Sequence, residues 1–124
     1  MGGKLENKNV EILASEARTA TVNSSDMTNK DSSGIHVIVD VTAIAATPSI
    51  VATIEAKDAK SGKYYTLLAS AAITTVSTNV LKVFPGALAS ANLIANDILP
   101  VTYRVTVTHG DADSITYSVS ANLI

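Results

Sequence analysis

A two-residue hydrophobic period, repeated in several short segments, constrains the fold of this 124-residue chain more than any other feature. In residues 35–42 every second side chain is Ile or Val, and the positions between them include His36, Asp40 and Thr42. Because successive side chains of a β-strand point to opposite faces, this spacing predicts a strand with one buried face. The same period recurs in residues 50–57, 101–108 and 115–121. We therefore expect half-buried strands rather than helices.

Turn-forming residues separate these segments at intervals of about ten residues. The segment 58–63 (DAKSGK) contains a glycine and lies between two strand-like runs, so residues 50–70 are predicted to form a β-hairpin. A second hairpin is predicted for residues 101–121, around the turn HGDADS at 109–114. Seven or eight short strands without crossover helices predict an all-β fold, an antiparallel β-sandwich or jelly roll.

The N-terminal quarter of the chain lacks the regular alternation. We predict an extended N-terminal arm and polar loop at residues 1–33, followed by the β-sandwich domain at residues 34–124. Residues 10–22 mix helix-favouring and strand-favouring side chains, and we expect them to be extended. Residues 23–34 are rich in Ser, Asn, Asp and Gly, which is typical of a loop. Residues 87–96 have helical composition but lie between two prolines, so a short turn or an ordered loop is expected there.

Five small or β-branched residue types, Ala, Thr, Val, Ser and Ile, supply 69 of the 124 residues. Val and Ile can build an aliphatic core, in which the four Tyr and the single Phe are the large side chains. Thr and Ser on the opposite strand faces form weakly charged surfaces, which suit either a solvated sheet face or contact with another protein. The chain has no Cys, so disulfide scaffolds and thiolate zinc sites are excluded.

The charge balance gives no reason to expect nucleic acid or a membrane as a partner. Nine Lys and Arg residues stand against eleven Asp and Glu residues, which leaves a net charge of -2 at pH 7. Lys57, Lys60 and Lys63 flank two tyrosines, but the acidic residues among them favour a solvated hairpin tip. No apolar run approaches the roughly 18 residues of a membrane span, and we expect no secretory signal in the polar first residues.

Residues able to carry chemistry are few. The chain has two histidines, His36 and His109, and no Gly-x-Ser-x-Gly motif, so we predict no catalytic residues, no cofactor and no enzymatic activity. The turn HGDADS places Asp111 and Asp113 at alternate positions, which makes them candidate calcium ligands. The alternative is that the aspartates cap the turn backbone, and this interpretation fits the composition better because the further ligands of a calcium loop are lacking.

Short motifs and the overall pattern of residues 34–124 carry a family resemblance. The motifs are Lys57-Asp58, Ser61-Gly62-Lys63-Tyr64, Phe84-Pro85-Gly86, Leu99-Pro100 and the closing HGDADSITYSV. Together they resemble a family of small virion proteins encoded by tailed phages and prophages. The resemblance implies a β-sandwich structural protein, with head decoration as the role: a protein on the capsid surface of the virion, made in the host cytoplasm, that stabilises the shell.

The implied partners are the lattice of the major capsid protein and further copies of the chain, in a homo-oligomer such as a trimer. The candidate interface residues are Val10, Ile12 and Leu13 in the arm and Tyr64 and Tyr65 at the hairpin. The arm would become ordered on contact with its neighbours. Two alternatives share the composition. One is a phage tail or baseplate component, and the other is a carbohydrate-binding adhesin domain that stacks sugars on tyrosine.

Overall fold

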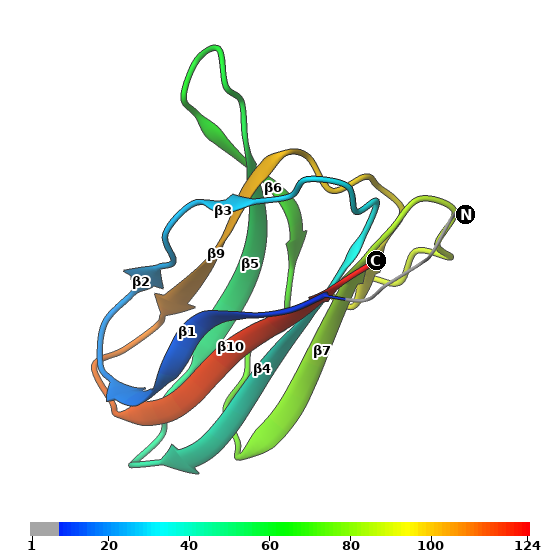
Figure 1. Cartoon of the computed structure of the whole chain (residues 1–124). Helices are drawn as coiled ribbons and strands as arrows, with labels where there is room; N and C mark the ends of the chain where they lie inside the picture. Colours follow the sequence, from blue (N-terminus) through cyan, green and yellow to red (C-terminus); the bar gives the residue numbers. More distant parts are fainter. Residues whose placement is uncertain (1–7) are drawn as a thin grey trace.

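The chain folds into a β-sandwich of two sheets (Figure 1). The computed structural model describes residues 8–124, which contain ten strands and no helix. The strands are β1 (Lys8–Arg18), β2 (Val22–Asn23), β3 (Met27–Thr28), β4 (Ile35–Ile44), β5 (Ile50–Lys57), β6 (Tyr64–Ala69), β7 (Ser77–Val83), β8 (Ile94–Ala95), β9 (Thr102–His109) and β10 (Ile115–Leu123). The predicted all-β sandwich is confirmed. Seven of the strands are long, and the other three, β2, β3 and β8, have two residues each.

The two sheets have five strands each. Sheet A has the order β1-β10-β4-β7-β8, and its pairs are antiparallel except for β7 with β8. Sheet B has the order β2-β9-β5-β6, with β3 also pairing with β9, and all its pairs are antiparallel. The predicted hairpin at residues 50–70 is confirmed as the β5–β6 pair, and its tip projects from the molecule (Figure 1).

The core lies between the sheets and is built from the alternating apolar rows. Strand β4 buries Ile35, Val37, Val39 and Val41, and the facing strands of both sheets bury their alternate residues in the same way. Tyr103 of β9 and Tyr117 of β10 are the largest fully buried side chains. The remaining volume is filled by Val, Ile, Leu and Ala, as the composition predicts.

The predicted second hairpin at residues 101–121 is wrong. Strand β9 belongs to sheet B and β10 to sheet A, so the segment between them carries the chain from one sheet to the other. The alternation of apolar and polar side chains is identical in a hairpin and in two strands that face each other across a core. The pattern therefore fixed the strands but left their pairing open.

The predicted arm and polar loop are part of the sandwich wherever the structure describes them. Strand β1 pairs with β10 along its length, and β2 and β3 pair with β9. Residues 1–7 lie outside the described residues. The register of β1 shifts between Glu11 and Leu13 and again between Leu13 and Glu16, which interrupts the two-residue period. The predicted division at residue 34 therefore separates strands that share sheets in the structure.

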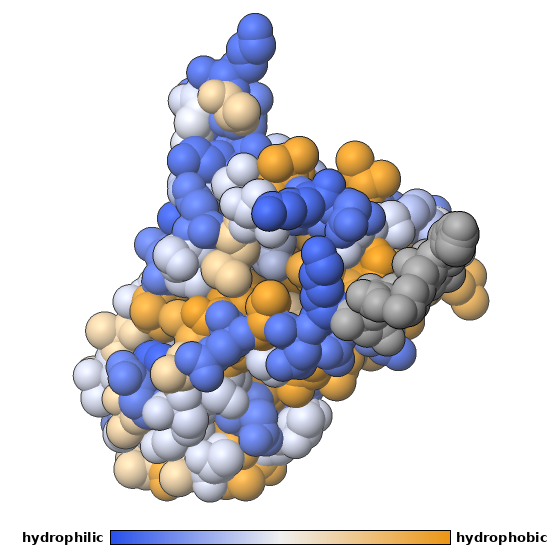
Figure 2. Space-filling model, viewed as in Figure 1, coloured by the Kyte–Doolittle hydropathy of each residue, from blue (hydrophilic) through white to orange (hydrophobic). Residues whose placement is uncertain are grey.

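The hydropathy of the surface differs between the hairpin tip and the loops beside it. The projecting tip of the β5–β6 hairpin is hydrophilic, whereas hydrophobic atoms gather where the other loops of that end converge (Figure 2). Residues 87–96 form an ordered loop, as expected, with β8 inside it. The described residues contain no helix with the length and apolarity needed to cross a membrane.

Candidate functional site

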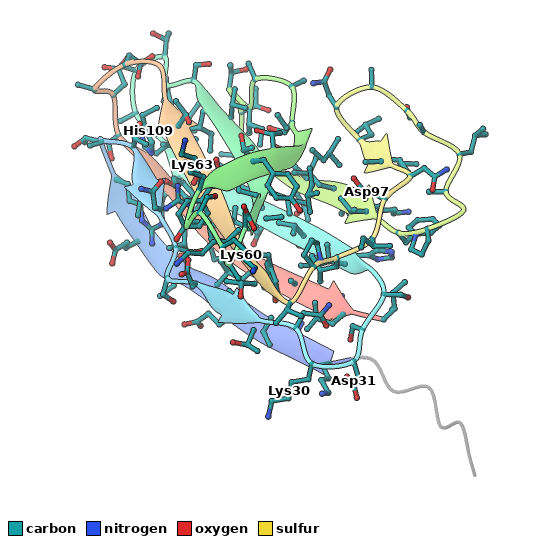
Figure 3. All side chains as sticks on the ribbon, turned by 90° about the horizontal axis from the view of Figure 1, so that it is seen from above. Lys30, Asp31, Lys60, Lys63, Asp97 and His109 are labelled. Carbon is teal, nitrogen blue, oxygen red and sulfur yellow. The ribbon has the colours of Figure 1, made fainter. Side chains whose placement is uncertain are left out.

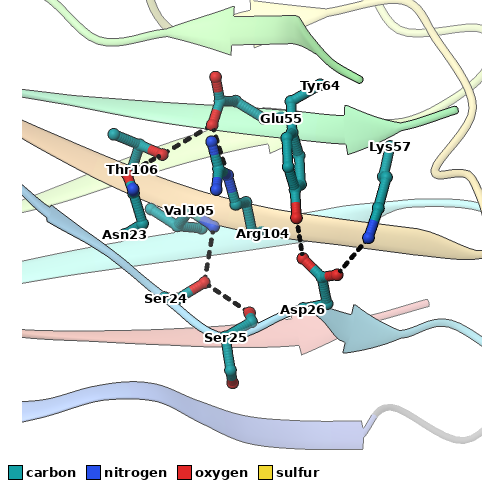
Figure 4. A network of polar contacts seen from close by, with 10 residues as sticks. All are labelled: Asn23, Ser24, Ser25, Asp26, Glu55, Lys57, Tyr64, Arg104, Val105 and Thr106. Atoms are coloured by element: carbon teal, nitrogen blue, oxygen red, sulfur yellow. Dashed lines mark hydrogen bonds and ion pairs between the residues drawn. The ribbon is translucent and has the colours of Figure 1, made fainter. Parts of the chain in front are cut away.

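The solvent-facing side of sheet B carries a network of interacting polar side chains (Figure 4). Glu55 of β5 accepts a hydrogen bond of 2.9 Å from Arg104 Nε on the adjacent strand β9. The Thr106 hydroxyl lies 2.6 Å from the same carboxylate oxygen and 3.0 Å from Asn23 Oδ1. Both members of the Arg104–Glu55 ion pair are about four-fifths buried. The group links three strands of one sheet through satisfied contacts.

Tyr64 is held at the centre of this face. The Arg104 guanidinium carbon lies 3.5 Å from the centroid of its ring, and its hydroxyl donates a 2.6 Å hydrogen bond to Asp26. Lys57 pairs with the other oxygen of Asp26 at 3.0 Å. The hydrogen bond from Tyr64 lowers the pKa of Asp26 most, and the hydrogen bond from Lys57 lowers it further. The hydrogen bond to Asp26 raises the pKa of Lys57. Tyr64 therefore anchors the β2–β3 segment across sheet B.

Tyr65 is the more exposed of the two predicted interface tyrosines, with 50% of its surface accessible. Tyr65 pairs with Ala56 and Tyr64 pairs with Lys57 in the β5–β6 register. Because successive side chains of a strand point to opposite faces, Tyr65 points away from the face that carries Tyr64. The two tyrosines thus lie on different faces of β6, and the Arg104 guanidinium lies over the ring of Tyr64. A sugar-binding platform of two parallel rings is not formed by this pair.

The three predicted interface residues of the arm contribute to the core. Ile12 is 8% exposed and belongs to the hydrophobic core, and Val10 and Leu13 pack against it. Strand β1 places them over the margin of the sandwich by pairing with β10. Ile12 is therefore buried within the chain, whereas Val10 and Leu13 keep part of their surface exposed, and their contact with a partner stays a prediction.

The two predicted calcium ligands hold turn backbone instead. Asp113 Oδ2 accepts a 3.2 Å hydrogen bond from the Thr47 amide, and Asp111 Oδ1 accepts a 3.0 Å bond from the Asp113 amide. These contacts are the backbone capping given as the alternative interpretation. Within residues 8–124, no group of three or more His, Cys, Asp or Glu side chains is placed to hold a metal ion.

The two histidines lie on different sheets and near opposite ends of the sandwich. His36 is on β4, next to Lys82, and its pKa is lowered by burial and then by the lysine charge. His109 ends β9, and its Nε2 lies 2.9 Å from the Tyr117 hydroxyl. Burial lowers the pKa of His109 and raises that of Tyr117 to about 12.

A cleft of about 370 Å³ opens between the margins of the two sheets. Its walls are the segment after β6, including Ala72 and Ile73, and strand β7, including Val80. Ala91, Asn92 and Leu93 close it from the loop between β7 and β8. No charged side chain lines the cleft: seven apolar residues line it together with Ser70, Thr78, Asn79 and Asn92, so it offers no charged acid or base. Its lining residues all lie within residues 70–93, but the sequence analysis missed it because the cleft forms only where the margins of the two sheets meet.

The comparisons with known proteins show a likeness of fold. No protein-family model matches the chain, and no curated protein matches it. A chain in the structure of infectious bursal disease virus, Gx strain, is similar over 95% of this chain, with a TM-score of 0.52 and 12% identity. A chain in the Gt strain structure gives a TM-score of 0.47 and 13% identity. This protein spans 32% of each viral chain. At this identity, the likeness concerns the sandwich alone.

Proposed function

We propose that this chain is a non-enzymatic structural protein of a virus particle, a decoration protein that binds the assembled capsid as an oligomer. The observation that carries the proposal is the sandwich itself, which is similar over nearly its whole length to part of a chain in a virus structure. The motif resemblance to small virion proteins of tailed phages and prophages supports the same role. The major capsid protein lattice is the proposed partner.

The chemistry of the described residues is in keeping with a structural role. The polar side chains of the sheet B network, Glu55, Arg104, Tyr64 and Asp26, bind one another. Every buried side-chain nitrogen or oxygen in residues 8–124 has a hydrogen-bond partner. Such satisfied polar groups stabilise the sheet surface.

The proposal is tested with particles of the virus or prophage whose genome encodes this chain. We expect the protein in purified particles by mass spectrometry, and its density on the capsid surface in a particle reconstruction. Adding purified protein to expanded heads that lack it should raise their melting temperature. Density in the tail or baseplate would replace decoration with the alternative location, and absence from particles would contradict the virion role.

A further inference from the structure

Charge is nearly absent from one continuous part of the chain. Only Lys82 and Asp97 are charged among the 38 residues from 64 to 101, whereas 16% of the whole chain is charged. This segment runs from β6 through β7 and β8 to the start of β9. It contains seven of the nine large hydrophobic side chains that are exposed in residues 8–124. We call the surface formed by residues 64–101 the charge-poor side.

The charge-poor side contains the end strand of each sheet, β6 of sheet B and the two-residue β8 of sheet A. Strand β6 is the last strand of sheet B and has no charged residue. Strand β8 pairs only with Lys82 and Val83, so most of β7 has no strand on its outer edge within the described residues. The opposite margin, β1, has register shifts and four charged side chains. Bulges and charges are the usual protection of a strand edge against pairing. Strand β6 pairs with β5 through one register shift but has no charge, and β7 carries only Lys82, so each has one kind of protection where β1 has both.

A projecting leucine and a cleft lie on this side. Leu88 is 90% exposed although its loop is ordered: the Gly86 amide donates to Asn96 Oδ1 at 2.9 Å, and the neighbouring Ala87 is buried. The same loop continues to Leu93, which lines the cleft beside β7. The cleft volume of about 370 Å³ exceeds that of a leucine side chain. Of the titratable residues labelled in Figure 3, only Asp97 lies by these loops.

We infer that the charge-poor side binds a second copy of this chain, with Leu88 of one copy seated in the uncharged cleft of the other. The inference rests on the proposed function for its setting and deepens it by naming the surface through which the oligomer forms. Three properties select a second copy. The surface supplies both the projecting Leu88 and the cleft that would receive it, as a self-complementary interface requires. It also has no charge pattern that would select a different partner. Of its 38 residues, 31 are at least partly exposed, which is enough surface for the roughly 20 to 30 residues a side of a standard interface.

Sedimentation of the full chain tests the inference with charge variants. We expect wild-type protein to self-associate in a concentration-dependent manner, and Leu88→Glu to weaken association at least about tenfold, since an apolar side chain loses its buried site. Ile44→Glu is the matched control, because Ile44 is an exposed apolar residue outside the charge-poor side. Wild-type protein that stays monomeric, or an equal effect of both variants, would overturn the inference.

Cysteine cross-linking tests the seating of Leu88 in the cleft, because the chain has no cysteine of its own. Leu88→Cys protein mixed with Ala72→Cys protein should form a mixed disulfide dimer under mild oxidation. Leu88→Cys mixed with Thr42→Cys, which is exposed on β4, should not. Equal yields from the two mixtures would contradict the seating.

The two proposals fail in different ways. Protein that is present on particles but monomeric in solution contradicts the second copy and leaves the virion role standing. Protein that self-associates through Leu88 but is absent from particles contradicts the virion role alone. If Leu88→Glu abolished binding to heads while wild-type protein remained monomeric, the shell would occupy this surface instead of a second copy.

Discussion

At the scale of single residues, the structure depends on polar side chains that hydrogen-bond to backbone groups where the pairing of strands is irregular. Arg18 ends β1 with a side chain that is 9% exposed. Its guanidinium donates to the Ala14 carbonyl at 2.7 Å and to the Tyr117 carbonyl at 2.8 Å. The register shift before Glu16 removes ladder partners from this stretch, so one planar side chain supplies them.

We expect Arg18→Ala to lower the free energy of unfolding by about 2 kcal/mol, because charged hydrogen bonds and contact with the Tyr117 ring are lost together. Arg18→Lys should recover only part of the lost stability, since a lysine ammonium cannot reproduce the planar set of N–H donors of the guanidinium. Urea denaturation at neutral pH measures both. Lys8→Ala is the control, because its 3.5 Å ion pair is exposed. A loss for Arg18→Ala no larger than the control would contradict the assignment.

The histidines make stability depend on pH. Burial lowers the folded-state pKa of His109 and of His36 below the ordinary value of 6.5. The unfolded chain therefore binds more protons in the window below 6.5, so the free energy of unfolding falls as the pH drops through it. We expect the decrease between about pH 7 and pH 5 to shrink in His109→Gln, and further when His36→Gln is added. An unchanged slope in the double variant would contradict this.

At the scale of elements, close approach between β4 and β7 requires glycine at residue 34. A Cβ atom there would lie 2.6 Å from Phe84 Cβ and 2.7 Å from the Val83 carbonyl oxygen. The Gly34 amide and carbonyl also bond to Ile124, so the backbone is held on both sides. The start of β4 and the ends of β7 and β10 are thereby fixed together.

We expect Gly34→Ala to lower the free energy of unfolding by about 1 to 3 kcal/mol, since backbone must shift to admit the methyl group. Gly110→Ala is a matched control, because its Cβ would meet only ordinary contacts at 3.5 Å or more, and we expect a change within about 0.5 kcal/mol. Thermal denaturation followed by circular dichroism measures both. Equal melting temperatures for the two variants would be evidence against a tight β4–β7 contact.

At the scale of the whole molecule, the segment before residue 34 completes both sheets. Strand β1 covers one edge of β10, and β2 and β3 cover β9. Ser24 adds a specific bond there: its buried hydroxyl accepts a 3.0 Å hydrogen bond from the Val105 amide. Removal of this segment would expose two long strand edges and part of the core at once.

We therefore expect a fragment of residues 34–124 to lack a cooperative thermal transition, although the alternating pattern alone marks it as a domain. The full chain is the control. Circular dichroism melting and the dispersion of amide NMR signals distinguish the two outcomes. A fragment with a cooperative melt and dispersed signals would restore the predicted division into an arm and a domain.

The predicted interface residues show where reasoning from sequence stopped. Tyr64 and Tyr65 are adjacent in the sequence but point to opposite faces of β6, and this follows from strand geometry once β6 is placed. Ile12 carries no such local signal, because its burial depends on pairing with β10, more than 100 residues away. The cleft lies within residues 70–93, but it depends on how the segment after β6 meets strand β7 of the other sheet.

The long strands of the sandwich, their buried faces and the β5–β6 hairpin follow from the amino-acid sequence, because each depends on side-chain alternation and on a turn within a few residues. Only the tertiary structure decided that β9 and β10 belong to different sheets, that β1 closes one margin, and that β6 and β7 leave the other open. Pairing partners are chosen by long-range packing and loop closure, and a period of two residues is the same whichever neighbour a strand takes.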